Sequence, residues 1–286
     1  MSDREEAAAP IRIYRYLRLI LHLFAGLLTV ALLFPAYDRE RRWRAIQRWA
    51  RGILSILNVA LHVRGAPPEG AQPLLGVSNH VSWLDIYAIH AAWRVRFVAK
   101  SEVRGWPAIG WLSARTGTLF IERGRHRHAA DINRAIHDAF ALGDAIAVFP
   151  EGTTTDGTEL RRFHASLLQP AVDENALVVP VALRYVNADG SVDVTPSYVG
   201  DTSLMESIVA IVSHRRTRAE VIFLAPIDAT GRNRRELAAA AQAAVANALR
   251  LPDPGTVPGT GGGLPGASPK VVGPTDNHCP DRANSA

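Results

Sequence analysis

The stretch SNHVSWLD places His80 and Asp85 five residues apart, directly after an apolar run. A histidine whose ring is fixed by a carboxylate through one nitrogen can take a proton from a hydroxyl with the other. Residues five apart in an ideal helix lie about 140° apart around its axis. The pair can therefore meet only if His80 lies on a loop and Asp85 in the first turn of the following helix. The alternative is a polar cap, opened by Asn79 or Ser82, with an incidental histidine, and these eight residues alone favour the cap.

Three further polar stretches follow or interrupt apolar runs. Arg123 follows TGTLFI, and an arginine at a strand end can bind a phosphate with its forked guanidinium. Glu151, Gly152 and Thr153 follow AIAVF, where carboxylate and hydroxyl can bind a polyol or phosphate headgroup and the glycine permits close backbone approach. Pro180 interrupts ALVVPVAL, which usually indicates an edge strand or a bulge. The alternatives are a solvated basic loop, an ordinary turn and a structural kink, respectively.

Apolar runs typical of strands alternate with helical patterns from Leu61 onward. The expected strands are 74–78, 95–99, 116–121, 145–149, 176–183, 192–199 and 219–225. The expected helices are 83–93, 129–142, 204–213 and 234–250. This alternation predicts an α/β fold with a largely parallel sheet flanked by helices. Ligands bind at the carboxyl ends of strands in such sheets, which is where the polar stretches are expected.

The segment Leu17–Phe34 is apolar apart from Arg18, His22 and Thr29. Its length is close to the roughly 20 residues that a spanning helix needs. A signal peptide is the alternative, but no small-x-small cleavage site follows the segment. Arginines flank it on both sides, so the positive-inside rule gives no orientation. This pattern favours a membrane-embedded segment whose two ends both stay on the cytoplasmic side.

A second helix is expected in RRWRAIQRWARGILSILNVAL, directly after that segment. Its basic face holds Arg41, Arg44, Arg48 and Arg51. Its apolar face, nearly opposite, holds Trp43, Ile46, Ala50, Ile53 and Leu57. A basic face opposite a tryptophan-bearing apolar face indicates a helix that lies in the membrane interface. The alternative is an ordinary surface helix of a soluble domain, and the neighbouring apolar segment favours the membrane interpretation.

The charge and cysteine content limit the classes of partner and cofactor. The 286-residue chain has a formal net charge of +5, which favours an anionic partner: a membrane surface, a nucleic acid or an acidic substrate. Its arginines are spread along the chain and no nucleic-acid motif occurs, so no nucleic-acid partner is expected. The single cysteine, Cys279, excludes a disulfide framework and a cysteine-based metal site.

Four motifs, taken together and in order, resemble the glycerolipid acyltransferase family, which includes 1-acyl-glycerol-3-phosphate acyltransferases. NHVSWLD resembles the family's His-x4-Asp block, and FIERGR, FPEGT and VVPVA resemble its second, third and fourth blocks. FVAKSEV and WPAIGWL, between the first two blocks, also look like family sequence. The resemblance covers about Pro73 to Ala225. Because the other three motifs follow in order, we interpret His80 as a base rather than as an incidental histidine.

The resemblance implies a reaction and a role for each residue. His80 would be the general base that removes the proton from the free hydroxyl of a lysolipid, and Asp85 would orient its ring. The oxygen would then attack the thioester carbonyl of acyl-CoA or acyl carrier protein, with no acyl-enzyme, no metal and no organic cofactor. Substrate binding would involve Arg123 at the acceptor's phosphate, Glu151, Gly152 and Thr153 at its headgroup, and Pro180 in shaping the pocket.

One position departs from the family pattern. An arginine often follows the third block, and Thr154 stands there in EGTTTDG, so one phosphate contact is missing unless Arg161 or Arg162 supplies it. The expected acceptor is 1-acyl-sn-glycerol-3-phosphate, which would become phosphatidic acid, and the alternative is another lysolipid such as a lyso-ornithine lipid. A hydrolase that uses His80 on water and a non-catalytic membrane lipid-binding protein are further alternatives.

These interpretations divide the chain into three parts. Residues 1–62 would form N-terminal membrane-associated helices, residues 63–251 the acyltransferase catalytic domain, and residues 252–286 a disordered tail rich in proline and glycine. The protein would act at the cytoplasmic face of the cell membrane on a membrane lipid acceptor.

Overall fold

The computed structural model describes residues 6–70, 72–121 and 126–254, which belong to one compact unit, Met1–Thr256. In this part of the chain, eight strands form one sheet in the order β1-β7-β6-β2-β5-β3-β4, with β8 beside β6. The strands are β1 Val59–Arg64, β2 Leu74–Ser78, β3 Val95–Lys100, β4 Leu119–Ile121, β5 Ala145–Val148, β6 Leu177–Val186, β7 Thr217–Phe223 and β8 Ile227–Asp228. β6 is antiparallel to β7 and β8, and the other strand pairs are parallel. The predicted fold class is therefore confirmed.

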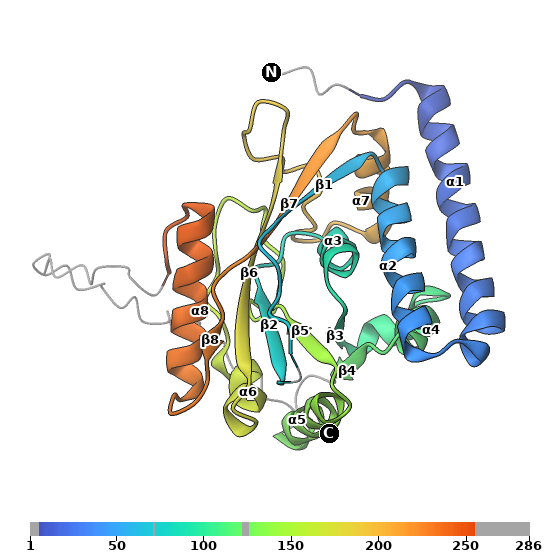
Figure 1. Cartoon of the computed structure of the whole chain (residues 1–286). Coiled ribbons are helices and arrows are strands. Elements are labelled where there is room, and N and C mark those ends of the chain that lie inside the picture. Colours follow the sequence, from blue (N-terminus) through green and yellow to red (C-terminus); the bar gives the residue numbers. More distant parts are fainter. Residues whose placement is uncertain (1–5, 71, 122–125, 255–286) are drawn as a thin grey trace, which may run out of the picture. The chain divides into compact units, whose positions relative to one another are not determined.

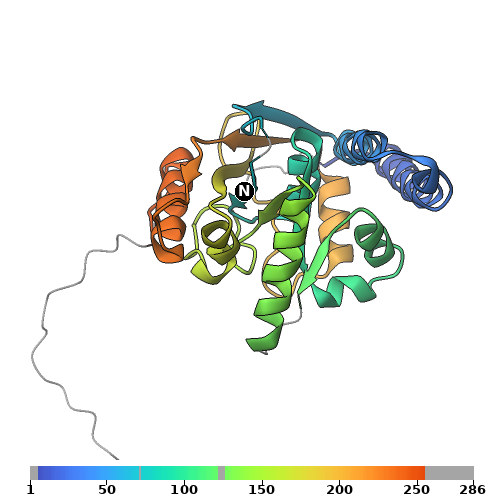
Figure 2. The ribbon, with the colours of Figure 1, turned by 60° about the horizontal axis from the view of Figure 1, so that its bottom comes forward.

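Helices cover both faces of this sheet. They are α1 Ala9–Leu28, α2 Arg39–Ile56, α3 Leu84–Ala92, α4 Ile109–Arg115, α5 His126–Ala141, α6 Gln169–Asp173, α7 Leu204–Ser213 and α8 Arg234–Leu249. Side chains alternate between the faces of a strand, so β6 contributes to two cores. Val181 and Leu183 pack with α2, α3 and α7, while Val178 and Ala182 pack with α5, α6 and α8. Figure 1 and the turned view of Figure 2 show α8 and the α1–α2 pair on opposite sides of the strands.

The strand order determines where the polar stretches meet. β2 lies between β5 and β6 and runs parallel to both, so the carboxyl ends of these strands lie at one edge of the sheet. The loop after β2 carries His80, and the loop after β5 carries Glu151. Tyr185 lies near the end of β6. The fold thus brings together residues that are 105 positions apart or less in the sequence, from His80 to Tyr185.

Two of the expected strands differ from the structure. The strand expected at 192–199 is wrong, because this segment forms turns and a single bridge between Val192 and Val186. The Asp193 carboxylate accepts from the Thr195 amide, and such local side-chain bonds compete with a strand ladder. The strand expected at 116–121 is shorter, since Gly117 takes φ +92° and only Leu119–Ile121 pairs.

A strand that the sequence interpretation missed, β1, crosses the expected boundary between residues 62 and 63. Its apolar residues continue the pattern of α2, which hides the change of element. Asn58 separates the two elements with φ +56°, a left-handed conformation that ends helices. β1 pairs with β7 from Val59 onward, so residues 59–62 belong to the sheet rather than to the helical segment.

α1 and α2 form an antiparallel pair joined by a π turn, Thr29–Leu33, and a 3-10 turn, Phe34–Ala36. His22 explains the polar position in the apolar segment, because its Nε2 lies 2.9 Å from the Trp49 carbonyl oxygen. Trp49 donates in return from Nε1 to the His22 carbonyl at 3.0 Å, and the two rings stack. Gly26 lets the helices approach, since a Cβ there would lie 2.6 Å from Trp49 Nε1.

The expectation that α2 lies in the membrane interface is wrong for its apolar face. Trp43, Ile46, Ala50, Ile53 and Leu57 are all buried within the protein. The last three belong to the core that α2 shares with α3 and α7, and the first two pack with the turn after α1. A tryptophan-bearing stripe has the same spacing whether it faces lipid or a protein core, so the pattern could not separate the two.

The exposed apolar face belongs to α1 instead. The exposed large apolar residues on α1 and the turns after it are Ile11, Ile13, Tyr14, Leu17, Ile20, Leu21, Phe24, Leu28, Leu32 and Leu33. Within the described residues, Ala9–Ala36 is the one helical stretch long and apolar enough to cross a membrane, and an 18-residue window within it has a mean hydropathy of 2.2. A contiguous apolar face of this size is typical of a protein or membrane contact.

Candidate active site

His80 and Asp85 meet in the one arrangement that their spacing allows, with His80 on the loop after β2 and Asp85 in the first turn of α3. His80 Nδ1 lies 2.7 Å from Asp85 Oδ2. The carboxylate only accepts, so Nδ1 carries the hydrogen and donates it, and Nε2 of the neutral ring is the nitrogen that can take a proton. The His80 side chain is 20% exposed whereas that of Asp85 is 0% exposed, so the base is accessible and its partner is not.

Asp85 also binds the backbone just before α3. Its Oδ2 accepts from the backbone amides of Val81 at 2.7 Å and Ser82 at 2.9 Å. The Leu84 amide at the start of α3 donates to Ser82 Oγ at 3.3 Å, so the contact expected of a polar cap and the His80–Asp85 pair are both present. Three donors on Oδ2 fix the carboxylate rigidly beside the imidazole.

The second oxygen of Asp85 has a partner that the sequence interpretation missed. The Tyr185 hydroxyl donates to Asp85 Oδ1 at 2.7 Å, and the side chain is fully buried. Burial is the largest cause that raises the pKa of Tyr185 well above its usual value, and the nearby Asp85 carboxylate adds to it. A tyrosine near the end of a buried strand needs a polar partner, which is the signal that could have identified it.

Glu151 is tied to the backbone on both sides of the site. Its Oε1 accepts from the His80 amide and its Oε2 from the Arg161 amide, each at 2.8 Å. Burial raises the pKa of Glu151 to about 7, against the lowering effect of these two amides. These contacts hold the His80 loop against the loop after β5. The expected role of Glu151 in headgroup binding stays a prediction.

The rest of the loop after β5 turns sharply. Gly152 takes φ +70°, which favours glycine, and Thr153 beside it is exposed. The Thr154 hydroxyl donates to the Tyr198 carbonyl, so the residue at the family's arginine position is neutral and used within the protein. The Thr155 amide donates to the His80 carbonyl at 2.9 Å, a second backbone tie to the base.

An aromatic stack supports the imidazole from the side of β5. The Phe149 ring lies parallel to His80 with 3.9 Å between centroids, and Phe97 stacks behind Phe149 at 5.5 Å. These rings restrict the imidazole to one plane. The phenylalanine of FPEGT is thus a contact of the base, which the sequence interpretation did not assign.

Asn79 fixes the loop on the other side, towards β6. Its carboxamide donates to the Leu183 carbonyl and accepts from the Leu183 amide, each at 2.8 Å. The side chain thereby continues the pairing of β2 with β6 after the last backbone pair, Ser78 and Val181. The alternative role that the sequence left open for Asn79, as a helix cap, is not the one it has.

Pro180 lies in the middle of the sheet, opposite Val77 of β2. Its carbonyl accepts from Leu224, where the neighbouring chain passes from β7 to β8, so its missing N–H faces this break. Proline here indicates a break in the adjacent strand rather than a sheet edge. By alternation its ring shares a face with Val178 and Ala182, opposite that of Tyr185. Its role in shaping a pocket stays a prediction, and Arg123 lies outside the described residues.

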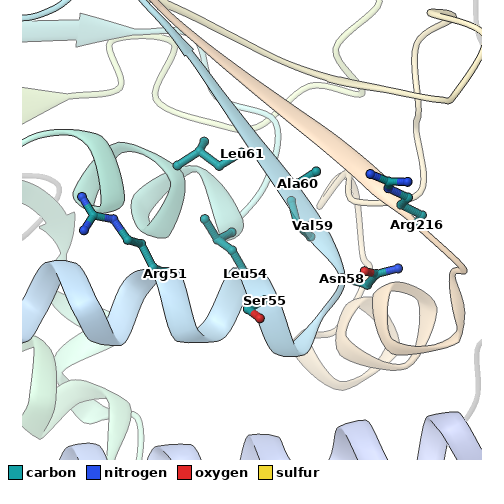
Figure 3. A pocket seen from close by; sticks show the side chains of 8 residues that line it. All are labelled: Arg51, Leu54, Ser55, Asn58, Val59, Ala60, Leu61 and Arg216. Atoms are coloured by element: carbon teal, nitrogen blue, oxygen red, sulfur yellow. The ribbon is translucent and has the colours of Figure 1, made fainter.

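A groove of about 320 Å³ lies elsewhere on the sheet, between the end of α2 and β1. Figure 3 shows Arg51 and Ser55 along the helix, and Asn58 and Arg216 near each other at the other end of the groove. β7 and β6 separate β1 from β2, and the groove contains none of the residues around His80. Its volume therefore does not mark the site of chemistry.

Comparisons with known proteins identify relatives of this chain. The family model described as Acyltransferase matches residues 60–184. A lyso-ornithine lipid O-acyltransferase of Pseudomonas aeruginosa is 38% identical over 215 residues, which cover 75% of this chain and 80% of that one. A 1-acyl-sn-glycerol-3-phosphate acyltransferase of Neisseria meningitidis is 38% identical over 190 residues, covering 66% and 74%.

A solved structure shares the fold. The crystal structure of the 1-acyl-sn-glycerophosphate (LPA) acyltransferase PlsC from Thermotoga maritima aligns with a TM-score of 0.64 at 20% identity, covering 84% of this chain and 94% of that one. Taken with the relatives and the family model, these similarities show that the chain belongs to the acyltransferase family.

Proposed function

We propose that this enzyme transfers a fatty acyl group from a thioester to the free hydroxyl of a lysolipid, with His80 as general base. The acceptor O–H proton moves to His80 Nε2 as the oxygen attacks the thioester carbonyl carbon. The C–S bond then breaks, the thiolate takes the proton from the imidazolium, and an ester and a thiol are released. The bond from His80 Nδ1 to Asp85 is the single observation that carries this mechanism, because it leaves Nε2 as the proton acceptor.

The acceptor is one of two lysolipids. The positive net charge and the exposed Arg161 and Arg162, ten and eleven residues after Glu151, favour the phosphate of 1-acyl-sn-glycerol-3-phosphate. The neutral Thr154 favours a lyso-ornithine lipid, since the phosphate loses one cationic contact. The relatives carry both names at the same identity, so they do not separate the two.

Purified enzyme offered both acceptors, each with acyl-CoA and with acylated carrier protein, tests the proposal when products are identified by mass spectrometry. Ester formation on either acceptor supports it, and the better donor identifies the thioester. Release of free fatty acid without ester would show a hydrolase instead. Binding of lysolipid without any turnover would show a lipid-binding protein.

Replacing Thr154 by arginine should move the preference towards 1-acyl-sn-glycerol-3-phosphate. A new charge-assisted contact with its phosphate should raise the ratio of kcat/KM for this acceptor over the lyso-ornithine lipid by about tenfold. The loss of the bond to Tyr198 would lower both values alike, so the ratio is the quantity to measure. Thr158→Arg adds the same charge to an exposed position of the same loop and should leave the ratio unchanged. An equal ratio in both variants would show that Thr154 does not face the headgroup.

We infer that the exposed face of α1 lies in the cytoplasmic leaflet of the cell membrane, where a lysolipid acceptor resides. The α1–α2 pair supports an embedded rather than a spanning arrangement, because α2 returns along α1 and its apolar face packs on the sheet domain. Reciprocal bonds between His22 and Trp49 hold α1 to α2 without covering its outer face. The chain would then present its outward apolar side chains to lipid on one side only.

Substituting Leu17 and Leu21 together by glutamate should release the enzyme from membranes. These side chains are 56% and 66% exposed and lie one helical turn apart, so the change should not disturb packing. Removing two leucines from contact with lipid and adding two charges should lower partitioning into vesicles by at least about 100-fold in a flotation assay. Leu142→Glu, at a position 62% exposed outside α1, is the control and should float like the wild type. Undiminished flotation of the double variant would place the membrane contact elsewhere.

A further inference from the structure

We propose that Tyr185 is a positioning residue of the acyl-transfer site, which keeps Asp85 a carboxylate so that His80 takes and holds the proton of the acceptor hydroxyl. The inference deepens the proposed function and rests on it. Tyr185 belongs to none of the four motifs and lies five residues after the last of their assigned positions, Pro180. Its contact with Asp85 depends on the fold and not on a local motif, because β6 pairs with β2.

The two oxygens of Asp85 face different groups. Oδ2 receives His80 Nδ1 and two backbone amides, and Oδ1 receives the Tyr185 hydroxyl at 2.7 Å. Asp85 is 0% and Tyr185 1% exposed, so water does not replace the hydroxyl if it is removed. Tyr185 is therefore the side-chain donor that satisfies the oxygen pointing away from the imidazole.

The direction of this hydrogen bond is determined by the surrounding charges. Tyr185 is buried near two carboxylates, Asp85 and Asp193, and both oppose loss of its proton. Its hydroxyl thus stays protonated and donates to Asp85. A hydrogen bond to the charged form of an acid favours that form. Glu151 has the opposite effect on Asp85, because the negative charges of the two carboxylates repel each other.

The consequence concerns where the proton rests during transfer. When His80 accepts the proton of the acceptor, the imidazolium lies 2.7 Å from Asp85 Oδ2, and the proton on Nδ1 could pass to a more basic carboxylate. Donation from Tyr185 to Asp85 Oδ1 stabilises the charged form of the carboxylate. The stabilising negative charge then remains on Asp85 while Nε2 holds the proton that the leaving thiolate needs. Tyr185 touches neither substrate in this arrangement and acts through Asp85.

Tyr185→Phe tests the inference because it removes only the hydroxyl. We expect kcat to fall about 10- to 30-fold with both KM values within about twofold of wild type, as for the loss of one hydrogen bond to a charged group. The acid limb of the profile of kcat/KM against pH should move to higher pH, because the His80–Asp85 pair gains proton affinity without this donor. Glu151, whose pKa burial raises to about 7, is present in the wild type and in Tyr185→Phe alike, so the difference between these two profiles is the readout.

A fluorinated tyrosine at position 185 gives the opposite sign. It keeps the ring and the hydroxyl but is a stronger donor, so the acid limb should move to lower pH. This variant also answers the question if Tyr185→Phe does not fold. Tyr87→Phe is the matched control, since Tyr87 lies on the same helix as Asp85 and its ring packs edge-on against Trp83 and Trp49. It should leave the acid limb in place.

A double-mutant cycle with Asp85→Asn shows whether Tyr185 acts through Asp85. In that background Tyr185→Phe should change kcat less than about twofold, whereas independent effects would multiply. An acid limb that stays at the wild-type pH in both position-185 variants, or multiplying effects in the cycle, would overturn the inference. The proposed function fails separately: a His80→Ala variant with near-normal turnover would remove the base itself, whatever the variants at Tyr185 show.

Discussion

Replacing His80 by alanine is expected to lower kcat for acyl transfer by about 10³- to 10⁴-fold, in the range that a well-placed general base contributes. Among the residues that the structure describes at the end of β2, His80 is the base, since Asp85 is fully buried and Glu151 accepts from two backbone amides. The fold should survive, because Asp85 still accepts hydrogen bonds from the amides of Val81 and Ser82, just before α3. Single-turnover assays of ester formation and thermal unfolding measure the two effects separately.

The control for this result is His164→Ala. His164 is an exposed histidine whose backbone amide donates to the Pro150 carbonyl, so it lies on the same side of β5 as Glu151. Its loss should leave kcat within about threefold of wild type if the base is His80 alone. Near-normal ester formation by the His80 variant would end the mechanism, and an equal loss in both variants would indicate two histidines in the proton transfer.

The pairing of His80 with Asp85 could be predicted from the sequence because it depends on one local change of element. The apolar run 74–78 predicts a strand and WLDIYAIHAAW predicts a helix, so the five-residue interval from His80 to Asp85 must cross a loop. The helix angle then lets the two side chains meet only with His80 on that loop and Asp85 in the first turn, and the resemblance of the four motifs favours this pairing over the cap. The strand–helix alternation likewise leads to a largely parallel sheet without knowledge of its strand order.

The supporting contacts could not be predicted because they cross the sheet. Tyr185 reaches Asp85 over 100 positions and Phe149 reaches His80 over 69, and both contacts depend on β2 lying between β5 and β6. The bonds from Glu151 to the His80 and Arg161 amides were not predicted either. A carboxylate after a strand suits a headgroup and a pair of backbone amides equally well. The apolar stripe of α2 had the same ambiguity between lipid and core. Side-chain type and spacing determined which residues gather, and strand order determined what they touch.

Removing the charge of Asp85 should lower kcat nearly as much as removing the base, His80. Asparagine at this position keeps the shape: its oxygen can accept from His80 Nδ1 and the two amides, and its NH₂ can donate to the Tyr185 hydroxyl, which accepts as well as donates. Only the negative charge beside the imidazolium is lost. We therefore expect Asp85→Asn to lower kcat about 10³-fold while changing thermal stability little, with the acid limb of the pH profile at lower pH because the imidazolium is less stabilised.

Asp193→Asn separates this charge effect from the general cost of altering a buried aspartate. Asp193 is buried, pairs with His214 Nε2 at 3.3 Å and accepts from the Thr217 hydroxyl at 2.7 Å. Those hydrogen bonds lower the pKa of Asp193 to about 2 despite its burial, so its ionised form stabilises the fold above its unfolded pKa and this stability is lost as pH falls towards 2. The Asp193 variant should thus unfold at a lower temperature near pH 7 yet keep kcat within about threefold. Retention of more than a tenth of wild-type kcat by a folded Asp85→Asn variant would mean that the imidazolium needs no anion beside it. Asp85 would then serve only to hold the backbone before α3.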